Sequence, residues 1–287
     1  MLSGWGGGRQ GWEAIIELAL AEDIGTGDVT TLSTVPAETR AHGSMLVKGA
    51  GVISGLQAAA YTFWRVDPSI EFTPLVCDGT SVEYGAIIAT MEGPARSLLT
   101  GERVALNVLQ RLSGVATLTN RFVAEIEGTG ALIVDTRKTT PGLRILEKAA
   151  VRDGGGHNHR VGLSDGVLIK DNHLAAIGGL YRVTNAILSA RALAPHTIKI
   201  EVEVTTIDEV IEAVEAKADI ILLDNMSLEM MTEAVTIIDG RALVEASGNV
   251  RLETVRAIAE TGVDLISCGA LTHSAPALDI SLNFELT

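Results

Sequence analysis

The feature that most constrains the fold is a series of apolar runs in the second part of the chain, most of them followed by a helical pattern. The six runs cover residues 131–134, 166–169, 198–204, 219–223, 242–244 and 264–266. Helical spacing recurs over 142–152, 174–193, 207–216, 227–238 and 252–260. Strands that alternate with helices pair in parallel through right-handed crossovers. Continuous apolar runs indicate strands that are buried on both faces.

Polar side chains follow nearly every predicted strand, which helps to choose between two α/β folds. An open doubly wound sheet gathers its ligands at one switch point, whereas a barrel can use the carboxyl end of every strand. We therefore expect an α/β barrel, with fewer than eight strands. The polar segments are Asp135-Thr136-Arg137-Lys138, Lys170-Asp171-Asn172-His173, Glu201 with Glu203, Asp224-Asn225, Glu245-Ala246-Ser247 and Ser267-Cys268-Gly269.

The first third of the chain has a different pattern. Helical spacing is found over 12–21, near 57–66 and over 98–127, and a turn-rich stretch covers 22–28. Short apolar runs broken by Gly and Pro predict short strands at 44–47, 51–53, 71–75 and 86–91. The Gly-rich residues 1–10 are expected to form a loose tail.

Composition narrows the class of protein. The chain has 287 residues, 47% of them hydrophobic, which is enough for one large or two medium domains. Its two cysteines, Cys77 and Cys268, lie far apart and suggest reduced thiols in a cytosolic protein rather than a disulfide framework. No apolar run approaches the length of a membrane span.

Charge is distributed unevenly along the chain. The net charge of −14 argues against general binding to nucleic acid or to an anionic membrane. Residues 103–170 nevertheless hold ten Lys or Arg against six Asp or Glu, a local charge of +4. A site for an anionic small molecule would need such a region, although chance clustering of solvated surface charges would also produce it.

Two segments supply cations, one directly after a predicted strand and one after the helical pattern that follows it. Arg137 and Lys138 combine a planar fork with a point charge, which suits carboxylate or phosphate; a surface loop that caps the next helix is the alternative. In Gly154-Gly155-Gly156-His157-Asn158-His159-Arg160, glycines that permit close backbone approach precede imidazole and guanidinium donors. A His pair without nearby Cys or carboxylate partners is weak support for zinc.

Lys170 ends a predicted strand, and three interpretations remain open for its amine. It could form a Schiff base, contact an anion, or simply reach solvent. His173, which follows three residues later, could act as an acid or base, or could cap the next helix.

Three carboxylates lie at neighbouring predicted strand ends. Glu201 and Glu203 are two residues apart on one strand and therefore face the same side, and Asp224 ends the next strand. Buried carboxylates are costly unless they are paired with cations or solvated by a ligand. Magnesium held beside substrate phosphates is one solution, which we favour for Glu203 and Asp224. Salt bridges to Lys138 or Lys170 are the other.

Small residues end the last two predicted strands. They occur in Ser247-Gly248-Asn249 and in Gly269-Ala270-Leu271-Thr272-His273. Such segments expose backbone N–H groups, and a helix is expected soon after Asn249, which within a barrel is a phosphate-binding geometry. Outside a barrel, Ser-Gly-Asn is only a turn.

Taken together, these segments resemble the quinolinate phosphoribosyltransferases, also called carboxylating nicotinate-nucleotide pyrophosphorylases. The similarity covers almost the whole chain in the expected order. It is carried by residues 22–28, 101–107, 109–114, 135–144, 154–162, 168–173, 222–225, 245–249 and 269–274.

The resemblance implies an α/β fold with an N-terminal α/β sandwich domain over 1–115 and an incomplete, seven-stranded α/β barrel over 116–273. Residues 274–287 would return to the first domain. It also implies a cytoplasmic homodimer or hexamer with shared active sites, and Mg²⁺ as cofactor. The implied reaction joins quinolinate to phosphoribosyl pyrophosphate and releases pyrophosphate and carbon dioxide, which yields nicotinate mononucleotide for NAD biosynthesis.

The resemblance also implies roles for single residues. Arg103 would reach in from the neighbouring subunit, and Lys138 would lie between the two substrates. Glu203 and Asp224 would hold Mg²⁺ near the pyrophosphate and, with Lys138, would form the catalytic set. Arg137, His159, Arg160 and Lys170 would bind the carboxylates of quinolinate. The ribose 5-phosphate would be bound by Ser247, Gly248, Asn249, Gly269 and His273.

Other functions compete with this one. A paralogue associated with molybdenum transport would share the fold, and a non-decarboxylating nicotinate transferase would need fewer cations. A Schiff-base aldolase built on Lys170 and a non-catalytic binding or assembly barrel belong to different classes. The complete runs Gly154–Arg160 and Leu168–His173 favour the quinolinate enzyme.

Overall fold

The computed structural model describes residues 11–286, so the tail expected over 1–10 lies outside the described residues. The chain forms two compact units, and it enters each of them more than once. Unit 1 comprises residues up to 120 together with 139–155 and 272 onward. Unit 2 comprises residues 121–138 and 156–271.

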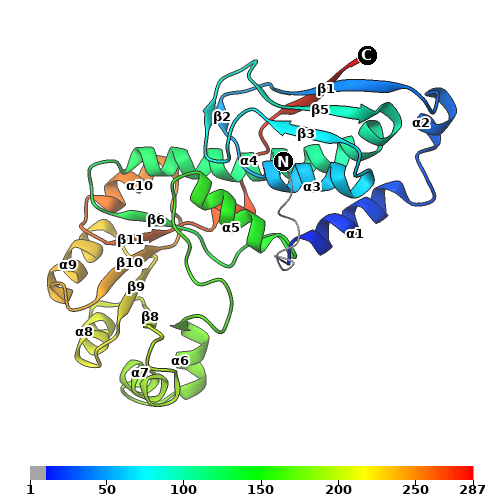
Figure 1. The fold of residues 1–287 in the computed structure, drawn as a ribbon. Coiled ribbons are helices and arrows are strands. Elements are labelled where there is room, and N and C mark those ends of the chain that lie inside the picture. Colours follow the sequence, from blue (N-terminus) through cyan, green and yellow to red (C-terminus); the bar gives the residue numbers. More distant parts are fainter. Residues whose placement is uncertain (1–10, 287) are drawn as a thin grey trace. The chain divides into compact units, whose positions relative to one another are not determined.

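Unit 1 contains a four-stranded antiparallel sheet with the order β12-β1-β5-β3 (Figure 1). Strand β12 comes from the end of the chain and pairs with β1, while β2 and β4 form a separate two-stranded sheet. The strands are β1 (Arg40–Val47), β2 (Gly51–Val52), β3 (Glu71–Pro74), β4 (Ser81–Val82), β5 (Ile87–Pro94) and β12 (Ile280–Leu286).

Helices α3 and α4 lie along one side of this sheet (Figure 1), where Phe63 and Leu109 join Met45 and Met91 of the strands in one apolar core. The helices of this part are α1 (Glu13–Ile24), α2 (Val29–Thr34), α3 (Leu56–Val66), α4 (Ala95–Glu125) and α5 (Arg144–Asp153). Helix α1 continues to Ile24, inside the stretch 22–28 that was expected to be a turn. It ends there because the next residue, Gly25, takes a positive φ of 53°.

Unit 2 is built on a six-stranded parallel sheet with the order β6-β11-β10-β9-β8-β7. The first strand therefore lies beside the last, which is typical of an α/β barrel. On the other side of β6, Val134 forms an isolated parallel bridge with His157. The strands are β6 (Leu132–Val134), β7 (Val167–Ile169), β8 (Ile200–Val204), β9 (Ile220–Asp224), β10 (Leu243–Ser247) and β11 (Leu265–Ser267).

This architecture confirms the expected fold class, an α/β protein with an N-terminal sheet domain and a parallel sheet consistent with an incomplete barrel. Each of the six strands coincides with one of the six apolar runs. Within the described residues the sheet has six strands, and only the bridge at His157 extends it beyond them.

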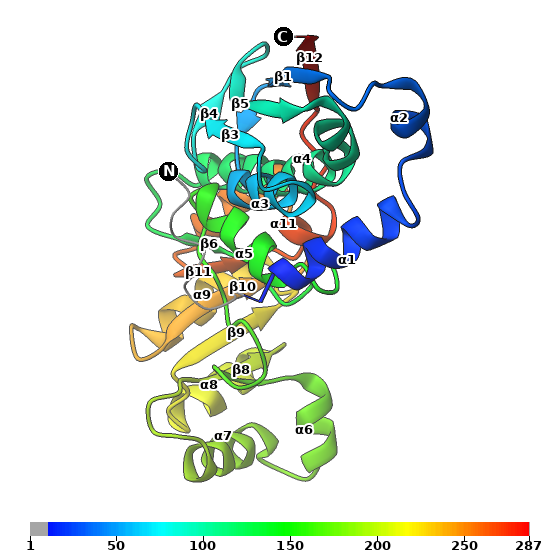
Figure 2. The ribbon, with the colours of Figure 1, turned by 45° about the vertical axis from the view of Figure 1, so that its right-hand side comes forward.

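Helices α7 to α10 pack against one another in chain order in unit 2. The single helix expected over 174–193 is wrong: Figure 2 shows two helices, α6 and α7. Gly178 and Gly179 separate them with φ of 65° and 77°, which a continuing helix does not allow. The helices are α6 (Asp171–Ile177), α7 (Arg182–Leu193), α8 (Ile207–Glu215), α9 (Leu228–Ile238), α10 (Leu252–Ala259) and α11 (Ala270–His273).

None of the helices in residues 11–286 combines the length and the apolar character that crossing a bilayer requires.

Candidate active site

The parallel register of unit 2 brings polar residues to one edge of the sheet. Strands β7, β8, β9 and β10 are consecutive neighbours, so their carboxyl ends lie side by side. Lys170 follows β7, Glu203 lies near the end of β8, and Asp224 ends β9 opposite Ser247 of β10. These four residues, which the sequence places at strand ends, therefore share one edge of the sheet.

His159 lies against two buried carboxylates. Its Nε2 is 3.0 Å from Oε2 of Glu201 and 3.5 Å from Oε2 of Glu245. The two Glu side chains are 4% and 1% exposed. Within the described residues, neither oxygen of Glu245 accepts a hydrogen bond, and neither does Oε1 of Glu201. The neighbouring imidazole is therefore the main source of compensation for this buried negative charge.

The charge of His159 follows from these contacts. Burial acts to lower the pKa of His159, but Glu201 and Glu245 outweigh it and raise that pKa from 6.5 to about 10. The backbone N–H of Arg160 lies 2.7 Å from Nδ1, a contact that favours a neutral ring. Two carboxylates in a poorly solvated site act more strongly than one peptide dipole, so we assign an imidazolium at neutral pH.

The same three residues are the group of potential metal ligands that the described chain offers, with ligand atoms within 4.8 Å of one another. We expected no carboxylate partner for His159, and that expectation is wrong, because Glu201 and Glu245 are distant from it in sequence but lie 3.0 and 3.5 Å from its Nε2. Because His159 Nε2 lies within ion-pairing distance of both carboxylates, the cluster is also a charge-paired site.

Arg160 follows His159 in the chain, and its guanidinium interacts electrostatically with Glu201 and with Arg137. Burial and the positive charge of Arg137 lower the pKa of Arg160, whereas the negative charge of Glu201 opposes that shift. Arg160 Nη1 donates to the carbonyl of Gly166 at 3.0 Å. Like-charged guanidinium groups repel each other, so an anion between them would lower the energy of the arrangement.

Asp135 opens one of the polar segments that follow predicted strands, but the sequence assigned it no role. It is fully buried, and its carboxylate accepts from Nδ2 of Asn158 at 2.6 Å and from the backbone N–H of His159 at 2.9 Å. It therefore fixes the segment that carries His159. Its position as the first polar residue after an apolar run was the available signal, and the same signal applied to Glu245.

Lys170 and His173 have local partners. Lys170 Nζ is 2.8 Å from Oε2 of Glu203, so the salt bridge considered for these carboxylates forms at Glu203, while Glu201 pairs with His159. His173 Nδ1 accepts the backbone N–H of Lys170 at 2.9 Å, which is the helix-capping alternative.

The ends of β9 and β10 are tied together by side-chain amides. Asn225 Nδ2 donates to Oδ2 of Asp224 at 2.9 Å, and Asn249 Nδ2 donates to Oδ1 of Asn225 at 3.0 Å. Gly248 has a φ of +97°, and a Cβ there would lie 2.2 Å from Oδ1 of Asn225. Glycine is therefore required at this position, and helix α10 begins shortly after it, as the phosphate prediction supposes.

Several predicted site residues have other surroundings. Lys138 is exposed, and its backbone N–H donates to Oγ1 of Thr136 at 3.0 Å. Gly269 lies between β11 and α11. Arg103 is exposed on α4 and His273 is exposed at the end of α11, and both belong to unit 1. Their roles stay predictions.

The carboxylates of Glu203 and Asp224 are compatible with the magnesium prediction, and Glu203 is at the same time paired with Lys170 at 2.8 Å. The two carboxylates stand at the ends of adjacent strands, and each is partly exposed. Magnesium is commonly bound through one or two carboxylates together with substrate phosphates, so a larger protein cage is not needed.

Models of one protein family match both parts of the chain. The model described as quinolinate phosphoribosyl transferase, C-terminal domain, matches residues 115–283, and its N-terminal counterpart matches residues 28–113. The chain belongs to the quinolinate phosphoribosyltransferase family. The resemblance noted in the sequence is thereby confirmed.

Individual relatives extend this similarity over nearly the full length. A probable nicotinate-nucleotide pyrophosphorylase (carboxylating) from Synechocystis sp. is 47% identical over 92% of this chain and 89% of its own. Quinolinate phosphoribosyltransferase (decarboxylating) 1 from Nicotiana glauca is 43% identical over 95% of this chain and 82% of its own. The crystal structure of NadC from Streptococcus pyogenes is similar with a TM-score of 0.91 and 41% identity, covering 96% of each chain.

Proposed function

We propose that this chain transfers the phosphoribosyl group from phosphoribosyl pyrophosphate to quinolinate, with loss of one carboxylate as carbon dioxide. The observation that carries the proposal is the cationic segment of unit 2, in which His159 contacts Glu201 and Glu245 and is followed by Arg160, whose guanidinium interacts electrostatically with Arg137. Quinolinate carries two carboxylates and therefore needs several convergent cations, for which arginine forks are suited. Nicotinate, with one carboxylate, would not require them all.

The chemistry asks the protein mainly for positioning and charge placement. The C1′–O bond to pyrophosphate breaks and its electron pair leaves with pyrophosphate, while the ring nitrogen of quinolinate gives its lone pair to C1′. The ring nitrogen is then cationic and stabilises the electron pair left at C2 when the bond to the adjacent carboxylate breaks. Carbon dioxide departs, and C2 takes up a proton from solvent.

The donor substrate would be held by the neighbouring strand ends. Glu203 and Asp224 would hold Mg²⁺, which supplies charge neutralisation for the leaving pyrophosphate when bound. Lys138 would lie between the substrates. The ribose 5-phosphate would be bound by Ser247, Gly248, Asn249, Gly269 and His273.

We further propose a cytoplasmic homodimer or hexamer in which each site is completed by Arg103 of the partner subunit. The exposure of Arg103 on α4 supports this role, because its guanidinium is available to a second chain. The two free cysteines, Cys77 and Cys268, suit a reducing compartment.

The contact of Lys170 argues against the aldolase alternative. A Schiff-base lysine must present a neutral amine to a carbonyl, whereas Lys170 Nζ is engaged with the Glu203 carboxylate at 2.8 Å. This geometry is that of an ammonium that contacts anions.

A comparison of two acceptors tests the proposal. Purified protein is supplied with phosphoribosyl pyrophosphate, Mg²⁺ and either quinolinate or nicotinate, and pyrophosphate release is followed. We expect kcat/KM for quinolinate to exceed that for nicotinate by about 100-fold or more, because the cations that bind the second carboxylate lack a partner in nicotinate. Equal rates with the two acids would overturn the assignment.

A further inference from the structure

An ion pair between the fully buried Glu147 and the partly exposed Arg111 joins elements of unit 1 that adjoin two proposed substrate contacts. Glu147 lies in the first turn of α5 and its side chain is 0% exposed. Arg111 of α4 donates to its Oε1 from Nε at 3.1 Å and from Nη2 at 2.8 Å. Burying two charges is unfavourable unless their remaining hydrogen-bonding atoms are satisfied. The other contacts of the pair are therefore informative.

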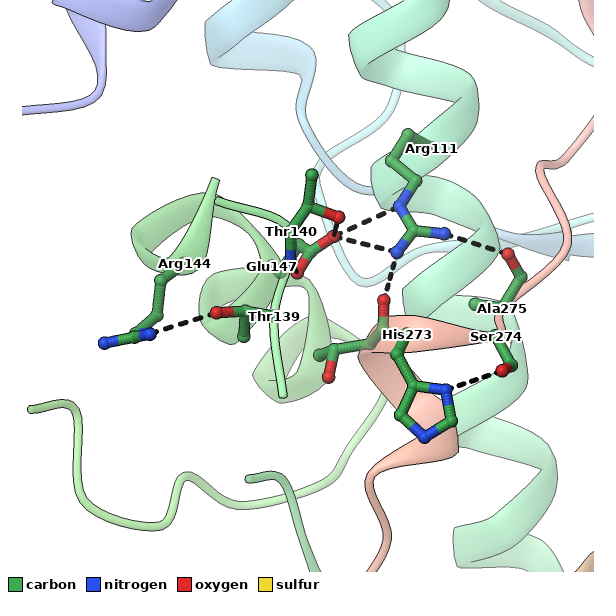
Figure 3. Close-up of polar contacts among 9 residues, drawn as sticks. Arg111, Thr139, Thr140, Arg144, Glu147, His273, Ser274 and Ala275 are labelled. Atoms are coloured by element: carbon green, nitrogen blue, oxygen red, sulfur yellow. Dashed lines mark hydrogen bonds and ion pairs between the residues drawn. The ribbon is translucent and has the colours of Figure 1, made fainter. Parts of the chain in front are cut away.

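Glu147 uses its remaining capacity on the segment that follows Lys138. Its Oε2 accepts the backbone N–H of Thr140 at 3.0 Å, and its Oε1 accepts Oγ1 of Thr140 at 2.8 Å. From the same turn of α5, Arg144 Nε donates to Oγ1 of Thr139 at 3.0 Å (Figure 3). Thr139 directly follows Lys138 in the chain, so α5 fixes the point where the chain leaves this lysine.

Arg111 uses its remaining donors on a different segment. Nη1 donates to the carbonyl of Ala275 at 3.0 Å, and Nη2 also donates to the carbonyl of Thr272. These carbonyls flank His273, whose Nδ1 is 2.6 Å from Oγ of Ser274. Figure 3 shows the guanidinium of Arg111 between Glu147 on one side and this segment on the other.

We propose that Arg111 and Glu147 are positioning residues for phosphoribosyl transfer. They fix the Thr139–Thr140 segment after Lys138 and the Thr272–Ala275 segment around His273 in one geometry. The inference rests on the proposed function, which places Lys138 between the substrates and His273 at the ribose 5-phosphate. Arg111 and Glu147 act through these neighbours and contact no substrate themselves.

The geometry depends on the particular side chains present. The guanidinium directs separate N–H groups at the Glu147 carboxylate and at two carbonyls, which the single nitrogen of a lysine cannot reproduce. Both oxygens of Glu147 face donors, whereas a glutamine in the same place offers one acceptor and turns an NH₂ group toward a donor. Conservative substitutions should therefore shift the two segments while retaining the fold.

The experiment compares three variants with a matched control in the full chain. Arg111→Lys and Glu147→Gln disturb the pair, and Thr140→Val removes one hydroxyl contact while keeping the backbone bond. The control is Gln110→Met, because Gln110 is adjacent on α4 and its Nε2 donates at 2.6 Å to the carbonyl of Ile280, which belongs to neither segment. Steady-state kinetics with quinolinate and phosphoribosyl pyrophosphate are measured beside thermal unfolding.

We expect Arg111→Lys and Glu147→Gln to lower kcat about 10- to 100-fold, since displacements near 1 Å have effects of this size. KM for phosphoribosyl pyrophosphate should rise in both, while KM for quinolinate stays within about threefold. Thr140→Val should also lower kcat and raise KM for phosphoribosyl pyrophosphate, by smaller factors. Its melting temperature should equal that of Gln110→Met, so that the kinetic change is not due to unfolding. The control should keep wild-type kinetics.

The outcomes separate this inference from the function on which it rests. Wild-type protein without turnover would overturn both. An active wild type combined with variants that lose activity only in proportion to their unfolded fraction would overturn the positioning role alone. Wild-type kinetics in folded Thr140→Val and Glu147→Gln would do the same.

Discussion

Two buried carboxylates, one in each unit, are treated in opposite ways. Glu147 in unit 1 accepts hydrogen bonds on both oxygens, from Arg111 and from Thr140. Glu245 in unit 2 is equally buried, yet neither of its oxygens accepts a hydrogen bond from the described residues, and its nearest cation is His159 at 3.5 Å. A buried carboxylate whose oxygens all accept hydrogen bonds is compatible with a stable fold, whereas one without such bonds lowers the stability of the protein. We expect the second kind where the charge acts on a bound ligand.

The cations of the two units follow the same division. Arg111 distributes its donors over one carboxylate and two carbonyls. In unit 2, Nε of Arg160 is buried and has no hydrogen-bond partner among the described residues. The comparison predicts that charge removal in unit 1 destabilises the protein, whereas charge removal in unit 2 mainly affects substrate binding.

The largest effect should come from Arg111→Met. This change leaves Glu147 buried with no cation, so we expect the free energy of unfolding to fall by about 3–5 kcal/mol. Urea unfolding followed by circular dichroism measures it. Arg160→Met is the matched change in unit 2 and should cost less than about 1 kcal/mol, because Arg160 Nη1 donates to the carbonyl of Gly166 rather than to a buried carboxylate. Equal losses in the two variants would remove the contrast between the units.

The next effect is expected for Arg137→Ala. Loss of a charge-assisted contact to a quinolinate carboxylate should lower kcat/KM for quinolinate about 100-fold. KM for phosphoribosyl pyrophosphate should change less than about threefold, and thermal stability should hardly change. Steady-state kinetics with each substrate varied in turn provide the measurement. A similar loss for both substrates would contradict the role given to Arg137.

A smaller effect tests whether the sites are shared between subunits. Arg103→Ala and Lys170→Ala should each be inactive alone, but mixed dimers contain one site with both wild-type residues if Arg103 acts in trans. Random reassembly should therefore restore roughly a quarter of the wild-type activity. Subunit exchange is verified with differently tagged chains, and verified mixed oligomers that recover nothing would exclude this arrangement.

The smallest effect concerns pH. A pKa of His159 near 10, raised from 6.5, means that its stabilising contribution is complete below pH 6.5 and is lost as pH rises from 6.5 to 10. Imidazole carbon resonances of His159 should therefore stay constant from pH 6 to 8. In Glu245→Gln one of the two carboxylates is removed, so the titration should move to lower pH. A wild-type midpoint at 6.5 would refute the assigned charge.

The strands of unit 2 were predictable because they are buried on both faces, and burial of that kind leaves a continuous apolar run in the sequence. The break between α6 and α7 was missed because apolar spacing continues across Gly178-Gly179, although the glycines themselves were visible. Helix α2 and strands β4 and β12 were also not anticipated: two are short, and β12 is paired by a partner far away in sequence.

The sequence predicted single residues of the candidate site at strand ends, but not the contacts between them. Arg137, Lys170 and Glu203 each follow or end an apolar run, which marks them without any knowledge of their partners. The pairing of His159 with Glu201 and Glu245 joins three separate segments, and no local pattern encodes it. The same holds for Arg111 and Glu147, whose helical positions resemble ordinary surface charges in the sequence.

The central claim is that the cations of unit 2 serve a dicarboxylate that is decarboxylated during transfer. The most direct measurement is product analysis after mixing the protein with quinolinate labelled in its C2 carboxylate, phosphoribosyl pyrophosphate and Mg²⁺. The account predicts nicotinate mononucleotide, pyrophosphate and labelled carbon dioxide in equal amounts. A nucleotide that retains the labelled carboxylate, or turnover with nicotinate but none with quinolinate, would contradict it.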